Sequence, residues 1–227
     1  MGGVGADRRT VILRGAARVI ARRGVRGLRV TELATEAGVS TALVYYHFKD
    51  RAGILRQTLE FISNRAERYT AGAAGAGHSA RDPRRALEHA LLLEFQDVPE
   101  VRENSTAWGE LRATAVFDPG LRDALAEARS IWIGELTDAL RRVHPTAPAP
   151  ALALAAERLV ATLEGLSMRW LSEVLPLAHA RRLMREAMVV ELAHLERAAD
   201  TAGAADTDLT ADTSPLAGPG HTAPLFD

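Results

Sequence analysis

The segment from Thr31 to Phe48, which reads TELATEAGVSTALVYYHF, decides the fold of this chain. It predicts two short helices on either side of a tight turn, because Gly38 suits the left-handed backbone conformation that ends a helix. Ser40 can cap the second helix, since its hydroxyl can accept a hydrogen bond from an unpaired backbone N–H. The apolar positions that can form a small core with a preceding helix are Leu33, Ala37, Val39, Val44 and Phe48. Together these features predict a helix-turn-helix.

The second helix of this motif has an outward face made of Thr41, Ala42, Tyr45, Tyr46 and His47. In a helix-turn-helix the second helix enters the major groove of DNA by its N-terminal end. Hydroxyl, methyl and phenol groups suit base edges and phosphates. A tyrosine on its own could also lie at the rim of a helical core, and some helix-turn-helix proteins bind no DNA. Because cap, turn and outward face are in register, we expect DNA recognition by residues 41–47.

The distribution of charge supports this expectation. Residues 1–56 hold eleven basic and four acidic side chains, a net charge of +7, so the rest of the chain carries −8 of the total of −1. Such an asymmetry indicates that one part of a chain meets a polyanion and the other does not. On charge alone, a solvated basic face is an equal alternative, and Arg22, Arg23 and Arg26 could belong to either.

Helical periodicity runs through the chain and predicts an all-α fold of about nine helices. The predicted helices are 7–23, 30–37, 41–47, 50–69, 82–97, 99–116, 118–143, 151–174 and 179–199. A flexible loop is expected at 71–79. These elements predict a helix-turn-helix domain at 1–56, a larger helical domain at 57–199 and a disordered tail at 200–227. With no cysteine, no secretory signal and no long apolar run, we expect a cytoplasmic protein without membrane contact.

Three stretches of this chain resemble the TetR family of transcriptional regulators: Val30–Ala34, Ala37–Ser40 and Tyr45–Arg51. The resemblance covers about residues 9–55, and the helical remainder looks like the family's ligand-binding and dimerisation domain. It implies a homodimeric repressor without cofactors, which binds a palindromic double-stranded DNA operator and is released by an unknown small-molecule effector. The residues expected to contact DNA are Arg29, Thr31, Ser40, Thr41, Ala42, Tyr45, Tyr46, His47, Lys49 and Arg51.

Two positions depart from the family pattern. Arg51 stands where lysine is usual, and because it keeps the charge we expect it to keep the phosphate contact. Leu28 and Arg29 stand where the family caps its second helix with threonine or serine. A hydroxyl contact to phosphate is therefore not expected there, although Arg29 could replace it with a charged one.

The C-terminal part is expected to hold an effector pocket, because it contains all three tryptophans and small-molecule sites are mostly apolar with a few placed polar groups. The candidate pocket residues are Trp108, Arg112, Phe117, Trp132, Glu135, Glu164 and Met168. Plain core packing is the alternative for each residue taken singly. Arg112 and Glu164 would be the sharpest candidates if buried, because an unpaired buried charge is costly.

The last two long helices are expected to pair with those of a second subunit. Near-heptad spacing selects Leu159, Thr162, Gly165, Leu166, Leu183, Ala187, Val190 and His194 as candidate dimer residues. An internal face of the same subunit is the alternative for individual positions.

No catalytic residue and no metal ligand is predicted. Glu191 and His194 have the Glu-x-x-His spacing of di-iron sites, but such sites need a second copy and further glutamates. The alternative to a DNA-binding regulator is a helical small-molecule carrier or interaction protein that binds no DNA, and an enzyme is a more distant third.

Overall fold

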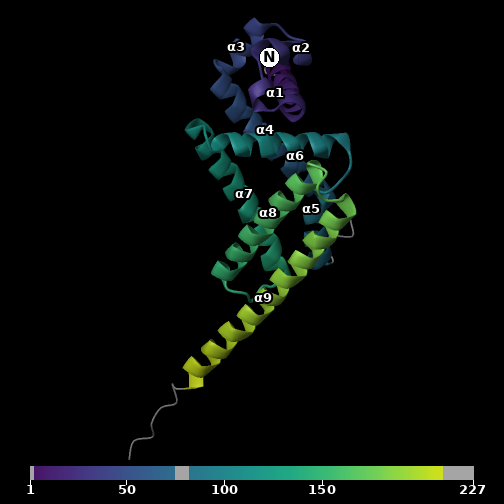
Figure 1. The fold of residues 1–227 in the computed structure, drawn as a ribbon. Helices are drawn as coiled ribbons and strands as arrows, with labels where there is room; N and C mark the ends of the chain where they lie inside the picture. The colour runs from purple at the N-terminus through teal and green to yellow at the C-terminus, as the bar shows by residue number, and fades with distance from the viewer. Residues whose placement is uncertain (1–2, 75–81, 212–227) are drawn as a thin grey trace, which may run out of the picture.

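The computed structural model describes residues 3–74 and 82–211 of the chain. Figure 1 shows an elongated molecule, with the N-terminal helices at one end and the last helix running out to the other. The described residues form nine α-helices and no strand, so the predicted all-α fold is confirmed.

The N-terminal unit is the predicted helix-turn-helix packed on a long first helix. Its elements are α1 (Gly3–Arg23), the 3-10 turn η1 (Val25–Gly27), α2 (Val30–Ala37), α3 (Thr41–Phe48) and the start of α4 (Arg51–Ala74). Leu33, Val44 and Phe48 are buried in one core with apolar residues of α1 and α4. This core fixes the position of α3 relative to the helices around it.

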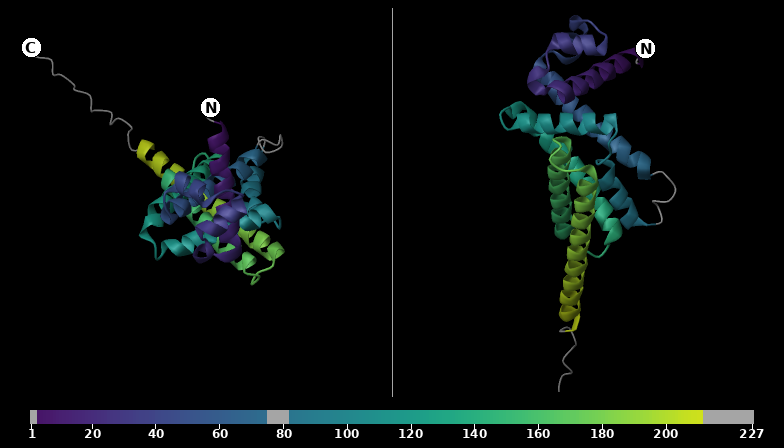
Figure 2. Two further views of the ribbon diagram at one scale, coloured as in Figure 1. Left: turned by 90° about the horizontal axis from the view of Figure 1, so that it is seen from above. Right: turned by 45° about the vertical axis from the view of Figure 1, so that its right-hand side comes forward.

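The C-terminal unit is a bundle of five helices with one 3-10 turn. They are α5 (Pro83–Leu93), α6 (Pro99–Ala115), η3 (Pro119–Leu121), α7 (Arg122–Val143), α8 (Ala149–Leu171) and α9 (Leu177–Ala211). Helices α8 and α9 run alongside one another, as Figure 2 shows, and they pack against α7 and α5. Asp82 caps α5 by accepting a hydrogen bond from the backbone N–H of Arg85 at 3.1 Å, as its position before a proline predicts.

Helix α6 lies between two hydrophobic cores. On one side its Ala107, Leu111 and Ala115 join the core of the helix-turn-helix unit. The second core is formed by α5, α7, α8 and α9 around Phe95 and Leu159. The first core therefore crosses the boundary predicted at residue 56, because α6 and α7 help to build it.

Helices α4 and α9 extend furthest beyond their predicted ends. Helix α4 reaches Ala74, and α9 reaches Ala211, so residues 200–211 are helical where a disordered tail was predicted. Alanine has the highest intrinsic helix propensity, and the alanine-rich sequence at both ends lets the helices continue. The remainder of the predicted loop, 75–79, and of the tail, 212–227, lies outside the described residues.

Candidate DNA-binding surface and ligand pocket

The turn between α2 and α3 has the geometry that the sequence predicts. Gly38 ends α2 with φ 64° and ψ 38°, a left-handed conformation that favours glycine. The Ser40 hydroxyl accepts a hydrogen bond from the backbone N–H of Leu43 at 3.2 Å and so caps α3. Cap and glycine together fix where α3 begins and which of its faces turns outward.

The outward face of α3 is exposed at the end of the molecule. Tyr45 and Tyr46 are 52% and 81% exposed, although tyrosine is usually at least half-buried in a folded protein. Thr41 and Ala42 are exposed beside them, and His47 is partly buried with its ring edge-on to Tyr46. The structure thus brings five predicted recognition residues together on one short helix.

Basic side chains around α3 fall into two groups. Arg29 and Lys49 are exposed and form no ion pair within the described residues, so both charges are available to a ligand. Arg18 and Arg22 instead both bind Glu36, and Arg23 binds Glu32, which ties α1 to α2. These hydrogen bonds and charges hold the pKa of the Glu36 carboxyl below its ordinary value, with Arg18 as the largest cause.

Arg51, which the sequence predicts to contact phosphate, also makes contacts within the protein. Its guanidinium donates hydrogen bonds to the backbone oxygens of Val25 at 2.6 Å and Leu28 at 3.4 Å. Arg51 therefore holds the turn η1 against the start of α4. Nearby, Asp50 accepts a hydrogen bond from the backbone N–H of Gly53 at 2.7 Å and caps α4.

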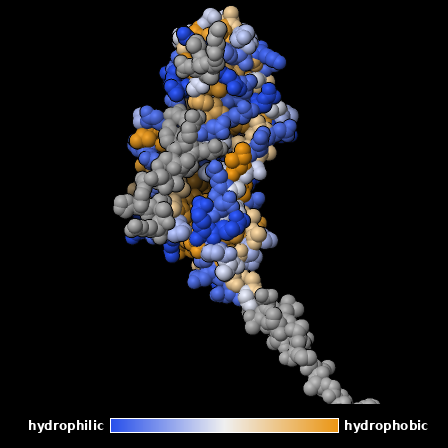
Figure 3. Space-filling model, turned by 180° about the vertical axis from the view of Figure 1, so that it is seen from behind, coloured by the Kyte–Doolittle hydropathy of each residue, from blue (hydrophilic) through white to orange (hydrophobic). Residues whose placement is uncertain are grey.

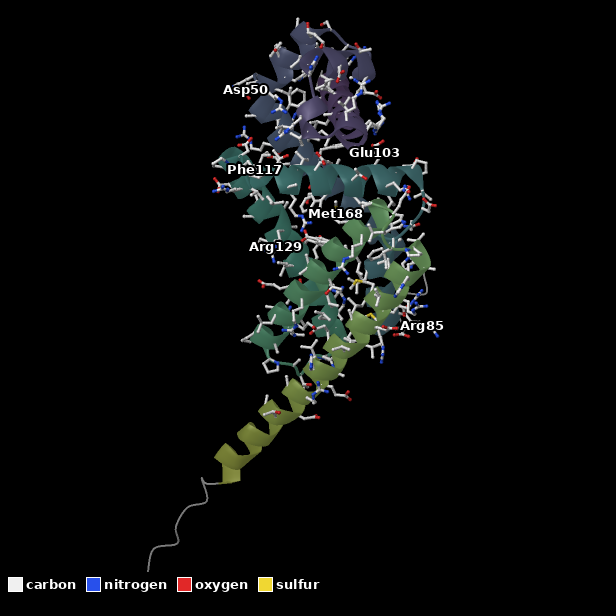
Figure 4. The ribbon with its side chains drawn as sticks, viewed as in Figure 1. Asp50, Arg85, Glu103, Phe117, Arg129 and Met168 are labelled. Atoms are coloured by element: carbon white, nitrogen blue, oxygen red, sulfur yellow. The ribbon has the colours of Figure 1, made fainter. Side chains whose placement is uncertain are left out.

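A pocket lies in the C-terminal unit on the opposite side of α6 from the helix-turn-helix. The space inside it is about 720 Å³ when the open solvent at its mouth is included. Six of the seven predicted pocket residues line it: Trp108, Arg112, Trp132, Glu135, Glu164 and Met168. Figure 4 shows Met168 on α8 beneath the middle of α6.

Phe117 is the exception and corrects the prediction. It follows the end of α6, is 86% exposed and does not line the pocket. In Figure 4 it lies at the end of α6, away from Met168. The turn that leads into η3 carries it outward, and aromatic character alone could not reveal this.

One ion pair spans the pocket between α6 and α8. Arg112 Nη1 donates to Glu164 Oε2 at 2.9 Å, and the indole N–H of Trp108 donates to Glu164 Oε1 at 3.3 Å. The charge of Arg112 is thereby already compensated. Two predicted residues are thus joined by a contact that their sequence positions did not specify.

Polar residues that the sequence analysis missed line the same pocket: Ser63, Glu94, Asn104, Ser105 and Ser167. The Ser105 hydroxyl lies 3.4 Å from Glu94 Oε2 and, among the described residues, is the one side chain hydrogen-bonded to that carboxyl. Burial raises the pKa of Glu94 above its ordinary value. Asn104 and Ser167 are polar residues on the otherwise apolar, buried faces of α6 and α8. A polar residue at such a position is the feature of the sequence that could have indicated a pocket.

Helix α6 connects the pocket to the DNA-binding unit. The residues Trp108 and Arg112 line the pocket, whereas Glu110 between them accepts a hydrogen bond from the backbone N–H of Val25 at 3.1 Å. A Cβ at Gly24 would come within 2.8 Å of the same carboxyl, so the contact is close. A displacement of α6 would therefore directly displace η1, the turn before α2.

The candidate dimer residues divide between the interior and the surface. Leu159 and Leu166 are buried in the core of their own subunit, which corrects their assignment to the interface. Gly165, Val190 and His194 are exposed, and Thr162, Leu183 and Ala187 are partly buried. Leu154 and Val189, which the spacing did not select, are also exposed apolar residues of α8 and α9.

The Glu-x-x-His pair on α9 has a structural explanation. Glu191 forms two hydrogen bonds with Arg158 of α8, at 2.7 and 2.6 Å. The described side chains include no group of three metal-ligating residues close enough to hold an ion. No helix in the described part of the chain is long and apolar enough to cross a membrane.

An exposed recognition helix, joined through α6 to a pocket in a separate helical unit, defines the class of ligand-responsive transcriptional regulators. Residues 12–58 match the family of bacterial regulatory proteins of the tetR type, and residues 83–193 match the C-terminal domain of BetI-type transcriptional repressors. The chain belongs to the TetR family, whose members are transcriptional regulators and not enzymes.

Three relatives illustrate the similarity. A solved structure described as a TetR-family transcriptional regulator from Rhodococcus sp. is 40% identical, covers 82% of this chain and 99% of its own, and has a TM-score of 0.74. The HTH-type transcriptional regulator BetI of Agrobacterium fabrum is 27% identical over 162 residues, 71% of this chain and 76% of that protein. A transcriptional regulator from Saccharomonospora viridis, solved in complex with choline, is 25% identical, covers 80% of this chain and 94% of its own, and has a TM-score of 0.66.

Proposed function

We propose that this regulator is a homodimeric repressor in the cytoplasm, which binds a palindromic operator and releases it when a small molecule enters the pocket. The observation that carries the proposal is the double role of α6, which lines the pocket with Trp108 and contacts the helix-turn-helix through Glu110. A ligand that binds two positions of α6 with different affinity would change the affinity for DNA, typically by 1–3 kcal/mol.

The DNA-binding part of the proposal rests on the exposed face of α3. In a two-fold symmetric dimer, two such helices would enter successive major grooves about 34–36 Å apart. Thr41 and Ala42 lie at the N-terminal end of α3, which would read base edges, and Tyr45 and Lys49 would contact phosphates. Figure 3 shows mainly hydrophilic side chains over this end of the molecule.

The dimer itself rests on the outer faces of α8 and α9. Leu154, Val189 and Val190 are each about half exposed there, and Gly165 has no atom within 4 Å of a Cβ built on it. A glycine inside a helix costs about 1 kcal/mol relative to alanine, which close approach of a second helix would offset. The pocket and the choline bound by the relative from Saccharomonospora viridis support a small-molecule effector.

The test is fluorescence anisotropy on labelled DNA from upstream of the gene, with a scrambled duplex as reference. We expect specific binding by two subunits or a multiple of two, weakening steeply with salt as counterions are released from phosphate. Lys49→Ala should reduce the salt slope by about one, whereas Arg142→Ala, at the far end of α7, should leave it unchanged. Tyr45→Phe should weaken binding to all sequences alike, and Thr41→Val should alter sequence preference.

A protein that binds neither the upstream DNA nor any duplex from a random-site selection would contradict the proposal. The small-molecule carrier without DNA affinity would then be the better description. Equal effects of Lys49→Ala and Arg142→Ala would show that the charge near α3 does not face the DNA backbone.

A further inference from the structure

We propose that the effector is a protonated primary or secondary amine with an apolar body, whose ammonium group binds Glu94, Asn104 and Ser167. The inference rests on the proposed function only in taking the pocket as the effector site, and it names the chemical class that the pocket would select.

The pocket is lined by more acidic than basic side chains. They are the carboxyl groups of Glu94, Glu135 and Glu164 and the guanidinium of Arg112. Arg112 is already bound to Glu164 at 2.9 Å. Glu94 is partly buried and has no cation beside it among the described residues, and removing a carboxylate from water without a counter-charge is costly. A positively charged ligand would supply the missing charge.

Two buried polar atoms of the pocket lack hydrogen bonds. Asn104 Oδ1 and Ser167 Oγ have no partner, although their residues are only 5% and 6% exposed. They are the two buried side-chain atoms of the described residues in this state. A buried polar atom without a hydrogen-bond partner destabilises the folded protein. Both line the pocket, so a ligand that donates hydrogen bonds would remove that cost.

The register of α6 on α8 places these oxygens in one part of the pocket. Arg112 meets Glu164, a Cβ on Gly109 would meet Met168, and Arg102 lies over the ring of Trp170. The two helices are therefore antiparallel, and Ser167, which lies between Glu164 and Trp170, faces the part of α6 between residues 102 and 112. Asn104 and Ser105 belong to that same part, and Ser105 contacts Glu94.

These acceptors distinguish an amine from other cations. A primary or secondary ammonium group carries N–H donors that can reach a carboxylate and two further oxygens. A quaternary ammonium group carries none, so it would leave Asn104 Oδ1 unpaired. A carboxylate ligand would add to the negative charge, because the one arginine of the lining is already engaged.

The remaining walls suit an apolar body. Ile62, Leu163 and Met168 line the pocket together with the rings of Trp108 and Trp132. Indole faces also attract cations, which adds to the preference for a positively charged ligand. The ligand class is therefore an amphipathic amine of small-molecule size.

Calorimetric titration of the DNA-free protein tests the class with matched probes. The probes are benzylamine and hexylamine, their alcohols benzyl alcohol and hexanol, the quaternary benzyltrimethylammonium, and the anion benzoate. We expect at least one amine to bind about tenfold tighter than its alcohol, because a hydrogen bond between charged groups is stronger than one from a neutral hydroxyl. We expect benzyltrimethylammonium and benzoate to bind more weakly than benzylamine.

Two variants and a control locate the ammonium group. Glu94→Gln should remove the preference for amine over alcohol, whereas Glu60→Gln, an exposed acid of α4 outside the pocket lining, should keep it. Ser167→Ala should weaken amine binding several-fold. Because the Ser167 hydroxyl has no partner in the folded protein, this variant should fold normally, and its circular dichroism should match the wild type.

The proposal is overturned if no amine exceeds its alcohol, if benzyltrimethylammonium binds as tightly as benzylamine, or if Glu94→Gln keeps the preference. Each of these results leaves operator binding intact, so the proposed function would stand with a different ligand class. Conversely, amine binding that leaves DNA affinity unchanged would support the ligand class and count against ligand-controlled release.

Discussion

The helix-turn-helix unit and the pocket differ in how completely their polar groups are paired. In the first, Ser40 and Asp50 cap helices, and Glu36 is held by two arginines. In the second, Asn104 Oδ1 and Ser167 Oγ are buried without partners. The polar groups named in the DNA-binding unit are thus paired in the absence of DNA, whereas two buried oxygens of the pocket are left for a ligand to hydrogen-bond.

The same contrast holds for packing. Leu33 and Phe48 lie in a closed core at the helix-turn-helix, as expected of a unit that must present α3 rigidly. Met168 lies beside a cavity and is 38% exposed. Free energy that the second region could have gained by close packing is instead left to be gained on binding.

The largest effect we expect comes from shortening an apolar side chain in each region. Leu33→Ala should lower the free energy of unfolding by about 2–5 kcal/mol, because it leaves a cavity in a closed core. Met168→Ala should cost much less, since its neighbours already border a cavity. Urea denaturation monitored by circular dichroism measures both, and equal losses would contradict the contrast in packing.

A smaller effect is expected where α3 meets α4. A Cβ at Gly53 would overlap the backbone oxygen of Phe48, so Gly53→Ala should cost about 1–3 kcal/mol. Gly134→Ala is the matched control on α7, where a Cβ meets no atom within 4 Å. That control should raise stability by up to about 1 kcal/mol through helix propensity. Thermal denaturation should show opposite shifts, and a harmless Gly53→Ala would refute the close approach.

Two serines offer a finer comparison of paired and unpaired hydroxyls. Ser40→Ala removes the cap of α3 and should cost about 0.5–2 kcal/mol. Ser167→Ala removes a hydroxyl that makes no hydrogen bond and should change stability little or raise it. The difference between the two free energies of unfolding is the quantity to measure. Similar costs would mean that the Ser167 hydroxyl is paired in solution.

The smallest effect is an opposite pH dependence of two glutamates. The pKa of Glu94 is raised by burial, so Glu94→Gln should stabilise the protein at neutral pH, and this gain should shrink as pH falls through that pKa. The pKa of Glu36 is lowered, so its stabilisation is present above its unfolded pKa of about 4.3 and is lost as pH falls through the folded value. Melting temperatures should be measured against pH for the wild type and both variants. At neutral pH, Glu94→Gln should melt at a higher temperature than the wild type, and Glu36→Gln at a lower one.

The sequence predicted those features that local chemistry determines. Gly38 and Ser40 specify their turn through backbone conformation and capping, which depend on neighbours in the chain, and both were predicted correctly. The all-α class and the family also followed from sequence. Helix ends were less certain, as the extension of α9 to Ala211 shows, because alanine-rich ends depend on small differences in propensity.

Features determined by tertiary contacts were not predictable in the same way. Phe117 was predicted to line the pocket but is exposed, and Glu94 lines the pocket but was not predicted to do so. Leu159 fits a heptad pattern, but that pattern cannot say whether the facing helix belongs to the same subunit. The backbone oxygens of Val25 and Leu28, which accept hydrogen bonds from Arg51, come close to it only when the chain has folded.

The contribution of α6 to the first core limits how freely this regulator can be recombined with others. Ala107, Leu111 and Ala115 complete the apolar base on which the DNA-reading helices rest. A chimaera joined near residue 56 would pack the α6 of another regulator against this core. Its side chains would not match the volumes of the apolar residues that they contact. Operator specificity should therefore be exchanged between such regulators in one of two ways. Either the exposed residues of α3 alone are replaced, or the whole helix-turn-helix unit is transferred together with its own α6.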